Sequence, residues 1–456
     1  MLKRHLVFGA TLLFIFTSCS PKIAPTQMQG KTATTFTHPK WSERTNIYEV
    51  NVRQYSPEGT FNAFAEALPR LRQMGVDVLW FMPVTPIGIK NRKANSSDLG
   101  SYYSVRNYKE INPEFGNMQD FKNLVNRAHS MGFKVIIDWV ANHTSADNPW
   151  LTTHPDFYEH DSAGNVVVPF DWTDTRQLNY KNQELRDSMI ADMEFWIRET
   201  NIDGFRCDVA QNVPADFWKE CITQLRKIKD VFMLAEGEEP ELHYAGFDET
   251  YTWSMMQPMS DVYHLKHNLK YLDSVINHNI DVYPKNAYRL FFTTNHDENS
   301  WNGTEFEKYG KAYKAFAVLT QTMYQSIPLI YSGQEEPNRK RLKFFVRDPI
   351  QWGKYELAPF YSTLLHLRER NKALDADASY QRITTCNDDA IFAYLREKKG
   401  KRVFVLLNLS PQPQSFTVDN KRINGKVKNV FSGAKENLDI NHVFQMKPWD
   451  YLVFEY

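Results

Sequence analysis

The chain has 456 residues, with 54 basic and 54 acidic side chains, so its formal net charge is zero. This balance gives no electrostatic basis for binding nucleic acid or an anionic membrane surface. The length predicts a large domain with additional modules rather than one small core.

A processing segment opens the chain. Basic residues precede an apolar run at 6–16, which is too short to span a bilayer and is typical of a secretory signal. The FTSC sequence that follows resembles the lipobox of bacterial lipoproteins, with Phe where Leu is usual, and implies lipidation of Cys19. An ordinary signal that happens to contain a cysteine is the alternative. We expect an exported lipoprotein anchored in the outer membrane, with a signal at 1–18 and a polar tether at 19–40.

A unit of helix, Gly or Asp, and buried strand recurs after the tether. In the segment 121–140, apolar residues follow helical spacing, Gly132 suits a left-handed helix end, and the remaining run is a continuous buried strand. Eight candidate strands follow this pattern, of which TYTWSM is the weakest: NIYEVNVRQY, GVDVLWFMPV, FKVIIDWV, DGFRCDV, VFMLAE, TYTWSM, RLFFTTN and IPLIYSG. The alternation predicts a (β/α)8 TIM barrel, with a doubly wound open sheet as the alternative fold.

Two segments depart from this alternation. Residues 144–180 are rich in Asp, Asn, Pro, Trp and Thr without a long apolar run, which predicts an inserted domain after the third strand. Residues 378–456 contain short apolar runs separated by turn signals, which predict an antiparallel β-sandwich domain. The barrel is then expected to consist of residues 41–143 and 181–377.

Four apolar runs end in acids, an Arg or a His: DWVANH (138–143), GFRCDVA (204–210), MLAEGEE (233–239) and FTTNHDEN (292–299). The carboxyl ends of parallel barrel strands meet at the face where barrel enzymes bind their substrates. We expect Asp208, Glu236 and Asp297 to come from three successive strand ends. Carboxylates gathered around one sugar are what glycoside cleavage requires, so the sequence predicts an enzyme.

These motifs, in this order, resemble the four signature regions of the α-amylase family, glycoside hydrolase family 13. QYSPEGTF, GSYYSVRNYKEINPEFG and IPLIYSGQEE add to the resemblance, which covers about residues 41–456. It implies a retaining glycosidase with Asp208 as nucleophile and Glu236 as general acid and base. Asp297 is implied to hold ring hydroxyls and to help distort the bound sugar.

The residue chemistry fits these roles. Arg206 lies two positions before Asp208 on a strand, hence on the same face, where its charge favours the ionised carboxylate. Glu236 is the first acid after an apolar run, and partial desolvation there raises a carboxyl pKa and keeps a proton available. Glu238 and Glu239 are chemical alternatives that lie further into the loop.

The resemblance also implies substrate contacts. It places Arg206, His143 and His296 in the substrate pocket, and Asp138 as a residue that braces the pocket. Tyr103 takes the place of the ring that stacks on the sugar being cleaved, with the neighbouring Tyr102 as the alternative.

No cofactor is required for this chemistry, and calcium is the open question. Asn142 matches a calcium ligand of many α-amylases, and Asp147 or Asp171 could add oxygen ligands. The Lys-His pair of those enzymes is replaced here by Gln211-Asn212, and SPEGTF replaces a second calcium loop. A turn and hydrogen-bonding role for Asn142 is the alternative.

The expected partner is an α-glucan, either starch or short α-1,4-linked oligosaccharides. DVAQN and RQLN resemble the branch of the family that degrades cyclodextrins and pullulan. The alternative is therefore a cyclomaltodextrinase-like or neopullulanase-like enzyme with α-1,6 or transglycosylation activity. Endo or exo action, hydrolysis or transfer, and oligomeric state stay open at this point.

Two other classes of protein compete with this interpretation. A non-catalytic glycan-binding protein would be favoured by loss of one of the three acids, all of which are present. A metal-dependent amidohydrolase needs several His ligands at strand ends, commonly beginning with His-x-His. The strand-end His residues of this chain stand beside Asn and Asp instead.

Overall fold

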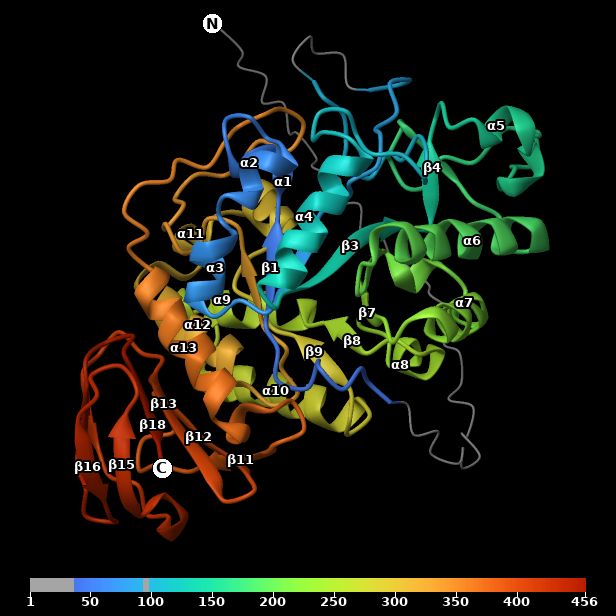
Figure 1. Ribbon diagram of the computed structural model, residues 1–456. Coiled ribbons are helices and arrows are strands. Elements are labelled where there is room, and N and C mark those ends of the chain that lie inside the picture. Colours follow the sequence, from blue (N-terminus) through green and yellow to red (C-terminus); the bar gives the residue numbers. More distant parts are fainter. Residues whose placement is uncertain (1–36, 93–97) are drawn as a thin grey trace, which may run out of the picture. The chain divides into compact units, whose positions relative to one another are not determined.

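The computed structural model describes residues 37–92 and 98–456 (Figure 1). The predicted signal, Cys19 and nearly all of the tether lie outside the described residues. Within the described part of the chain, no helix combines the length and apolar character needed to cross a membrane.

A parallel eight-stranded sheet occupies the centre of this part (Figure 1). Its strands are β1 (Ile47–Val50), β2 (Val78–Phe81), β3 (Lys134–Val140), β6 (Gly204–Asp208), β7 (Phe232–Ala235), β8 (Glu249–Tyr251), β9 (Tyr288–Leu290) and β10 (Leu329–Tyr331). They follow the order β10-β1-β2-β3-β6-β7-β8-β9. The sheet closes where Arg289 N donates to Gln325 O (2.8 Å) and Leu329 N donates to Phe291 O (3.0 Å). The TIM barrel is confirmed, and the open doubly wound sheet is wrong.

Two sequence expectations about the strands need correction. The sixth strand was expected in TYTWSM, but β8 begins at Glu249 and ends at Tyr251, and the chain turns into a short 3-10 helix at Trp253. Because β8 lies between β7 and β9, Asp208, Glu236 and Asp297 do not come from three successive strands. The sixth barrel strand, β8, lies between the strands that lead to Glu236 and Asp297.

Helices cover the outside of the barrel (Figure 1). They are α1 (Val52–Tyr55), α2 (Phe61–Ala65), α3 (Leu68–Met74), α4 (Met118–Ser130), α6 (Gln183–Thr200), α7 (Ala215–Ile228), α8 (Glu241–Ala245), α9 (Met256–Tyr263), α10 (Leu269–Val282), α11 (Glu305–Tyr309), α12 (Tyr313–Thr322) and α13 (Ala358–Arg370), whereas α5 (Trp150–Thr153) belongs to the insertion after β3. The segment before β3 shows why the repeating unit of helix, turn and strand forms. Asn117 and Asp120 form a capping box at the start of α4, and Gly132 turns the chain with φ 87° toward β3.

The insertion after the third barrel strand contains a short antiparallel ribbon. In this ribbon β4 (His143–Ser145) pairs with β5 (Thr175–Gln177), with His143 opposite Gln177. The ribbon continues directly from the carboxyl end of β3, so it places residues of the insertion beside the barrel's strand ends.

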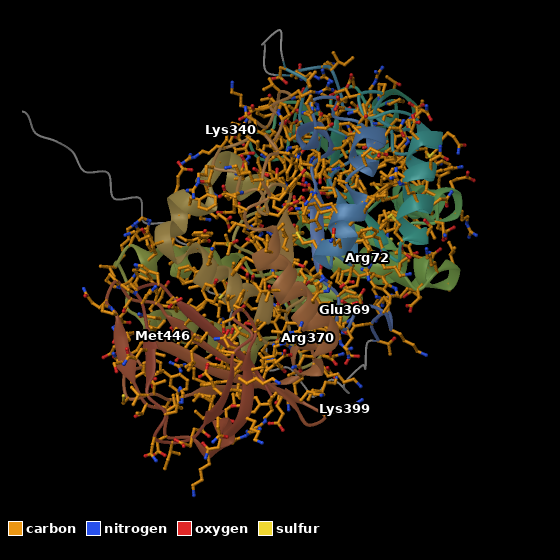
Figure 2. All side chains as sticks on the ribbon, turned by 60° about the vertical axis from the view of Figure 1, so that its left-hand side comes forward. Arg72, Lys340, Glu369, Arg370, Lys399 and Met446 are labelled. Atoms are coloured by element: carbon orange, nitrogen blue, oxygen red, sulfur yellow. The ribbon has the colours of Figure 1, made fainter. Side chains whose placement is uncertain are left out.

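The C-terminal part forms an antiparallel six-stranded sheet and a separate two-stranded ribbon. The sheet contains β11 (Ser379–Ile383), β12 (Ile391–Lys398), β13 (Lys401–Asn408), β18 (Tyr451–Glu455), β15 (Gly425–Asn429) and β16 (Lys435–Leu438), and the ribbon pairs β14 (Gln414–Phe416) with β17 (Phe444–Met446). Arg370 of α13, labelled in Figure 2, binds both carboxylate oxygens of Glu455 on β18 (3.0 and 3.2 Å). The predicted antiparallel β module is confirmed.

Candidate active site

A pocket of about 320 Å³ lies at the carboxyl ends of the barrel strands. The three predicted acids Asp208, Glu236 and Asp297 all line it. The other lining side chains that the site uses are histidines and aromatic rings: Tyr103, His143, Trp172, His296, Trp301, Phe344 and Phe345. The structure therefore brings together residues that lie up to about 240 positions apart in the sequence.

Arg206 lies beneath this pocket and joins its acids. One nitrogen, Nη1, donates to Asp138 (2.8 Å) and Asp208 (2.9 Å), and Nη2 lies 2.9 Å from Oε2 of Glu236. Nε donates to the hydroxyl of Tyr251 (3.1 Å). One guanidinium therefore holds three carboxyl groups from three neighbouring strands, β3, β6 and the end of β7.

Burial corrects part of the expected role of this arginine. The side chains of Arg206 and Asp138 are both 0% exposed, and neither lines the pocket, so a direct contact of Arg206 with substrate does not fit the structure, whereas Asp138 lies where a bracing residue is expected. Both lie below the pocket, where Arg206 binds Asp208 and Glu236, while Asp138 binds Arg206 and Tyr103. A guanidinium surrounded by carboxylates on a fully buried strand face has no free donor directed at solvent.

The pKa of each central acid is raised. Burial raises the pKa of Asp208 to about 6, although Arg206 acts in the opposite direction, so the expected stabilisation by Arg206 is present but smaller than the effect of burial. Burial also raises the pKa of Glu236 to about 7, with further contributions from the charges of Asp208 and Asp297. This agrees with the desolvation expected from the place of Glu236 after an apolar run.

Val209 is a feature of the site that the sequence analysis missed. It follows Asp208 and adopts φ 34°, in the left-handed region that β-branched residues rarely enter. In this conformation its backbone N–H donates to Oε2 of Glu236 (2.8 Å). A strained backbone of this kind costs about 1–3 kcal/mol, and here it connects the two predicted catalytic acids.

A second group of polar side chains surrounds His296. The hydroxyl of Tyr103 lies 2.7 Å from Nε2 of His296 and donates to Asp138 (3.1 Å), while Asp297 lies 3.2 Å from the same imidazole nitrogen. Tyr102 is 1% exposed and binds Asn51 instead. Tyr103, and not its neighbour, is thus the tyrosine that borders the pocket.

His143 lines the pocket from the opposite side, on β4. Its ring lies 5.2 Å from that of Trp172, and burial lowers the pKa of His143 to about 4, so the imidazole is neutral at pH 7. Nδ1 contacts the side-chain amide of Asn142, whereas Nε2 has no hydrogen-bond partner among the described residues.

The oxygen atoms of Asn142 accept hydrogen bonds, as in the alternative role for this residue. Its backbone and side-chain oxygens both accept from Nε2 of Gln177 (3.0 Å each), so an amide donor occupies the atoms that a cation would use. Asp147, one of the proposed additional ligands, accepts from the backbone N–H of Ile89 (2.9 Å), and Asp171 lies exposed on the pocket wall.

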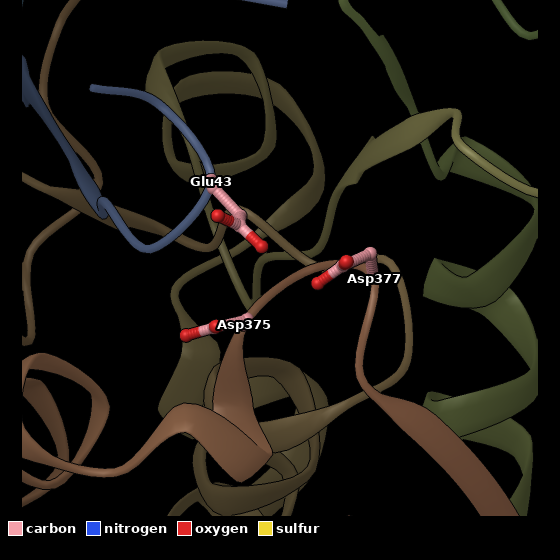
Figure 3. Close-up of side chains that lie close together, drawn as sticks. All are labelled: Glu43, Asp375 and Asp377. Atoms are coloured by element: carbon pink, nitrogen blue, oxygen red, sulfur yellow. The ribbon is translucent and has the colours of Figure 1, made fainter. Parts of the chain in front are cut away.

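A cluster of acids elsewhere is also explained without a metal ion. Among the described residues, Glu43, Asp375 and Asp377 lie close enough together to hold one (Figure 3). The ammonium of Lys398 contacts all three carboxylates, and Arg44 adds a second cation at Asp375 (2.5 Å). These contacts make the cluster an ion-pair network.

The alternative acids after β7 have other contacts. Glu238 accepts from Ser254 (2.8 Å) and Arg289 (3.2 Å), and neither Glu238 nor Glu239 lines the pocket. Of these three acids, Glu236 alone therefore lines the pocket.

Comparison with known proteins agrees with this geometry. The family model for the α-amylase catalytic domain matches residues 27–164 and 167–385, which is more than half of the chain. This protein belongs to the α-amylase family. The model for the C-terminal domain of maltogenic amylase matches residues 381–453. The chain is accordingly an enzyme of the α-amylase type.

Individual relatives are distant in sequence but similar in structure. Alpha-amylase 3 of Dictyoglomus thermophilum is 26% identical, over 84% of this chain and 88% of that protein. Alpha-amylase MalA of Haloarcula japonica is 27% identical over 82% of this chain, but the chain spans only 57% of that protein. The crystal structure of the noncanonic maltogenic α-amylase AmyB from Thermotoga neapolitana matches with a TM-score of 0.83 and 27% identity, over 91% of this chain and 99% of that one.

Proposed function

We propose that this α-amylase family enzyme hydrolyses α-1,4-glucosidic bonds in starch, maltodextrins or related α-glucans with retention of configuration. The observation that carries the proposal is the pairing of Asp208 and Glu236 on the guanidinium of Arg206. Two carboxyl groups bound to one guanidinium are close neighbours. The retaining route requires a separation of about 5–5.5 Å, shorter than the inverting route, which must leave room for a water molecule.

In the first step, a carboxylate oxygen of Asp208 attacks the anomeric carbon while Glu236 gives its proton to the glycosidic oxygen. The bond from that carbon to the leaving sugar breaks, and a covalent glycosyl–Asp208 ester forms. The raised pKa of Glu236 supplies the proton near neutral pH, and Arg206 favours the ionised form of Asp208.

In the second step, Glu236, now ionised, takes a proton from water, and the resulting hydroxide adds to the anomeric carbon as the ester bond to Asp208 breaks. Two inversions restore the α configuration. Asp297, whose side chain is 34% exposed and lines the pocket, holds ring hydroxyls during both steps. A sugar hydroxyl in place of water would give transglycosylation.

Aromatic rings in the pocket support a sugar as the substrate. Trp301, 51% exposed, contacts Phe344 with ring centroids 5.3 Å apart, and Phe344 is stacked against Tyr103. Ring faces of this kind bind the apolar faces of pyranoses. Trp172, beside His143, provides a ring on the insertion.

The product profile of a chain beginning after Cys19 on maltoheptaose and pullulan tests the function. We expect short maltooligosaccharides that appear first as α-anomers by NMR, and no product from Asp208→Asn. First appearance of β-anomers would contradict retention, and no turnover of either glucan would contradict α-glucan hydrolysis.

A cyclomaltodextrinase-like or neopullulanase-like activity is the second candidate. A cyclomaltodextrinase from a Bacillus species is 24% identical over 77% of this chain and 65% of that protein. The match to the maltogenic amylase C-terminal domain points in the same direction. Faster cleavage of β-cyclodextrin or pullulan than of starch would favour this candidate.

We also propose that the enzyme is exported and held in the outer membrane by a lipid on Cys19, on the evidence of the FTSC sequence. Metabolic labelling with an alkyne fatty acid is expected to mark the full-length chain but not Cys19→Ala. Equal labelling of both chains would contradict the anchor.

A further inference from the structure

An acidic side chain occupies the interior of β1. Glu49 is 0% exposed, between Tyr48 and Val50 on a strand whose other residues are apolar or aromatic. A carboxylate in such a place is costly unless it is paired and hydrogen-bonded. No motif in the sequence predicts a role for Glu49.

The partner of Glu49 is His296. Oε1 of Glu49 lies 2.5 Å from Nδ1 of the imidazole, across 247 positions of sequence. The second oxygen, Oε2, has no hydrogen-bond partner among the described residues. Among the described residues, His296 is therefore the only hydrogen-bond partner of this buried carboxylate.

The second ring nitrogen of His296, Nε2, contacts two residues that line the pocket. Nε2 of His296 lies 2.7 Å from the hydroxyl of Tyr103 and 3.2 Å from Oδ2 of Asp297. The rings of His296 and Tyr103 are stacked, with centroids 5.5 Å apart. Glu49 thus acts on two pocket residues through one imidazole.

The charges around His296 favour its protonated form. Glu49 faces it from β1, Asp297 from its own segment and Asp138 from β3, while Arg206 on β6 is the opposing cation. Burial alone would lower the pKa of His296, but the carboxylates of Asp297 and Glu49 raise it to about 9.

The protonation state sets the direction of the hydrogen bonds. An imidazolium donates from both nitrogens, so Nε2–H points to Tyr103 Oη and Asp297, and the Tyr103 hydroxyl is left to donate to Asp138. A neutral ring protonated on Nδ1 would instead accept at Nε2 and draw the tyrosine proton away from Asp138. The protonation state of His296 therefore sets the direction in which the Tyr103 hydroxyl in the pocket wall donates.

We propose that Glu49 is a positioning residue that keeps His296 an imidazolium, with Nε2–H directed at Tyr103 and Asp297. The role rests on the proposed hydrolase function, because its consequence for turnover comes through the orientation of Asp297 and Tyr103 around the sugar.

Histidine NMR tests the proposal in Glu49→Gln. With 13C-labelled histidine, the His296 signal is identified by its absence from His296→Gln. We expect this signal to titrate near pH 9 in the wild type and at least one pH unit lower in Glu49→Gln, because the neutral amide no longer stabilises the imidazolium. Glu49→Asp keeps the charge and is expected to restore part of the shift.

Glu305→Gln is the matched control. Glu305 is another buried acid, 2% exposed, that binds Thr293 and Gln334 away from His296. We expect it to leave the His296 titration and kcat unchanged. In Glu49→Gln we expect kcat to fall about 10- to 100-fold with a smaller change in KM, as misplacement of groups near the reacting atoms does.

An unchanged His296 titration in Glu49→Gln would overturn the proposal, as would an equal loss of kcat in Glu305→Gln. The NMR measurement does not depend on turnover. If the wild type cleaves no α-glucan while the His296 signal still shifts in Glu49→Gln, the positioning role stands and the proposed function fails.

Discussion

Two buried carboxylates at the amino ends of the barrel strands, Asp203 and Asp248, have partners of a different kind from those of the acids around the pocket. At the amino ends, Asp203 directly precedes β6 and accepts from the backbone N–H of Val135 (2.9 Å) and from His129 (2.7 Å). Lys229 (3.1 Å) and Lys134 (3.3 Å) add two ammonium groups. Although burial acts in the opposite direction, these donors lower the pKa of Asp203 to about 2.

Asp248, directly before β8, repeats this arrangement with its own set of donors. It binds His38, Arg226 and the backbone N–H of Met233, each at 2.8 Å. The amino end of the barrel thus supplies several donors for each of these acids.

At the carboxyl ends of the barrel strands, several acids share one cationic partner. Asp138, Asp208 and Glu236 share Arg206, and burial raises the pKa of all three. The same fold thus contains buried carboxylates with several donors each, which stabilise it, and buried carboxylates that share one cation, which stabilise it less. Variants at the two ends should therefore have opposite effects on stability and activity.

The largest effect is expected for Asp208→Asn. Without a nucleophile, kcat on maltoheptaose should fall by roughly 10⁴–10⁶-fold. The midpoint of thermal unfolding at pH 8 should stay the same or rise, because one of three acids that share a cation loses its charge. A large loss of stability would contradict the comparison and show that the acid–Arg206 contact is mainly structural.

Glu236→Gln should lower kcat on a natural glucan by about 10²–10⁴-fold, the usual contribution of a general acid. With α-maltosyl fluoride, whose leaving group needs no proton, the first step should be nearly unaffected. Burst kinetics on the two substrates would separate these outcomes. Equal losses on both substrates would argue against the proton-donor role.

The pH profile gives a further test of the carboxyl end. As pH falls through about 6, Asp208 becomes protonated and the nucleophile is lost; as pH rises through about 7, Glu236 loses its proton and the acid is lost. A narrow bell in kcat/KM is expected between these values, which belong to the coupled pair. A profile that stays level to pH 9 would contradict the raised pKa of Glu236.

At the amino end, Asp203→Asn should reduce the free energy of unfolding by about 2.5 kcal/mol at pH 7, since each pKa unit is worth about 1.36 kcal/mol. Because the folded pKa lies below the ordinary value, this stabilisation is present above about pH 4 and is lost as pH falls through about 2. Urea unfolding at pH 7 and pH 3 would measure it. Asp230→Asn, at an exposed position, is the control, and kcat should be unchanged in both.

The smallest effect concerns the backbone strain at Val209. Asn tolerates a positive φ better than a β-branched residue, so Val209→Asn should raise the free energy of unfolding by about 1 kcal/mol. Denaturant unfolding of this variant beside the wild type measures the gain. A loss of stability would mean that side-chain packing of Val209 outweighs the strain.

The sequence predicted the barrel because each βα unit contains its own local signals. The apolar spacing of α4 and the left-handed Gly132 act within one unit, and the structure shows both, together with a capping box at Asn117. β8 was placed inaccurately because its strand has only three residues and the aromatic run TYTWSM continues past its end. Because the carboxyl ends of parallel strands meet at one face, the sequence placed the three acids at one pocket. β8 nevertheless lies between the strands that lead to Glu236 and Asp297.

Other parts of the site depend on contacts between segments far apart in the sequence. Glu49 looked like an isolated acid in an apolar strand, and only the closed barrel brings it to His296. Burial decided that Arg206 and Asp138 lie below the pocket, which a spacing of two residues does not reveal. Trp301, in the helical turn Glu298–Asn302, meets Phe344 from a later loop, and the only signal for the two rings was an aromatic content of 14%.

The C-terminal sheet has a consequence for how the chain unfolds. On β12 and β13, Tyr394, Val403 and Val405 belong to the same apolar cluster as the barrel, while the alternate residues Leu395 and Phe404 belong to a second cluster inside the sheet. Separating the two parts would expose one face of the sheet to water. Calorimetry should therefore show residues 37–456 melting in a single cooperative transition, and a chain cut at residue 378 should aggregate instead of yielding a free barrel.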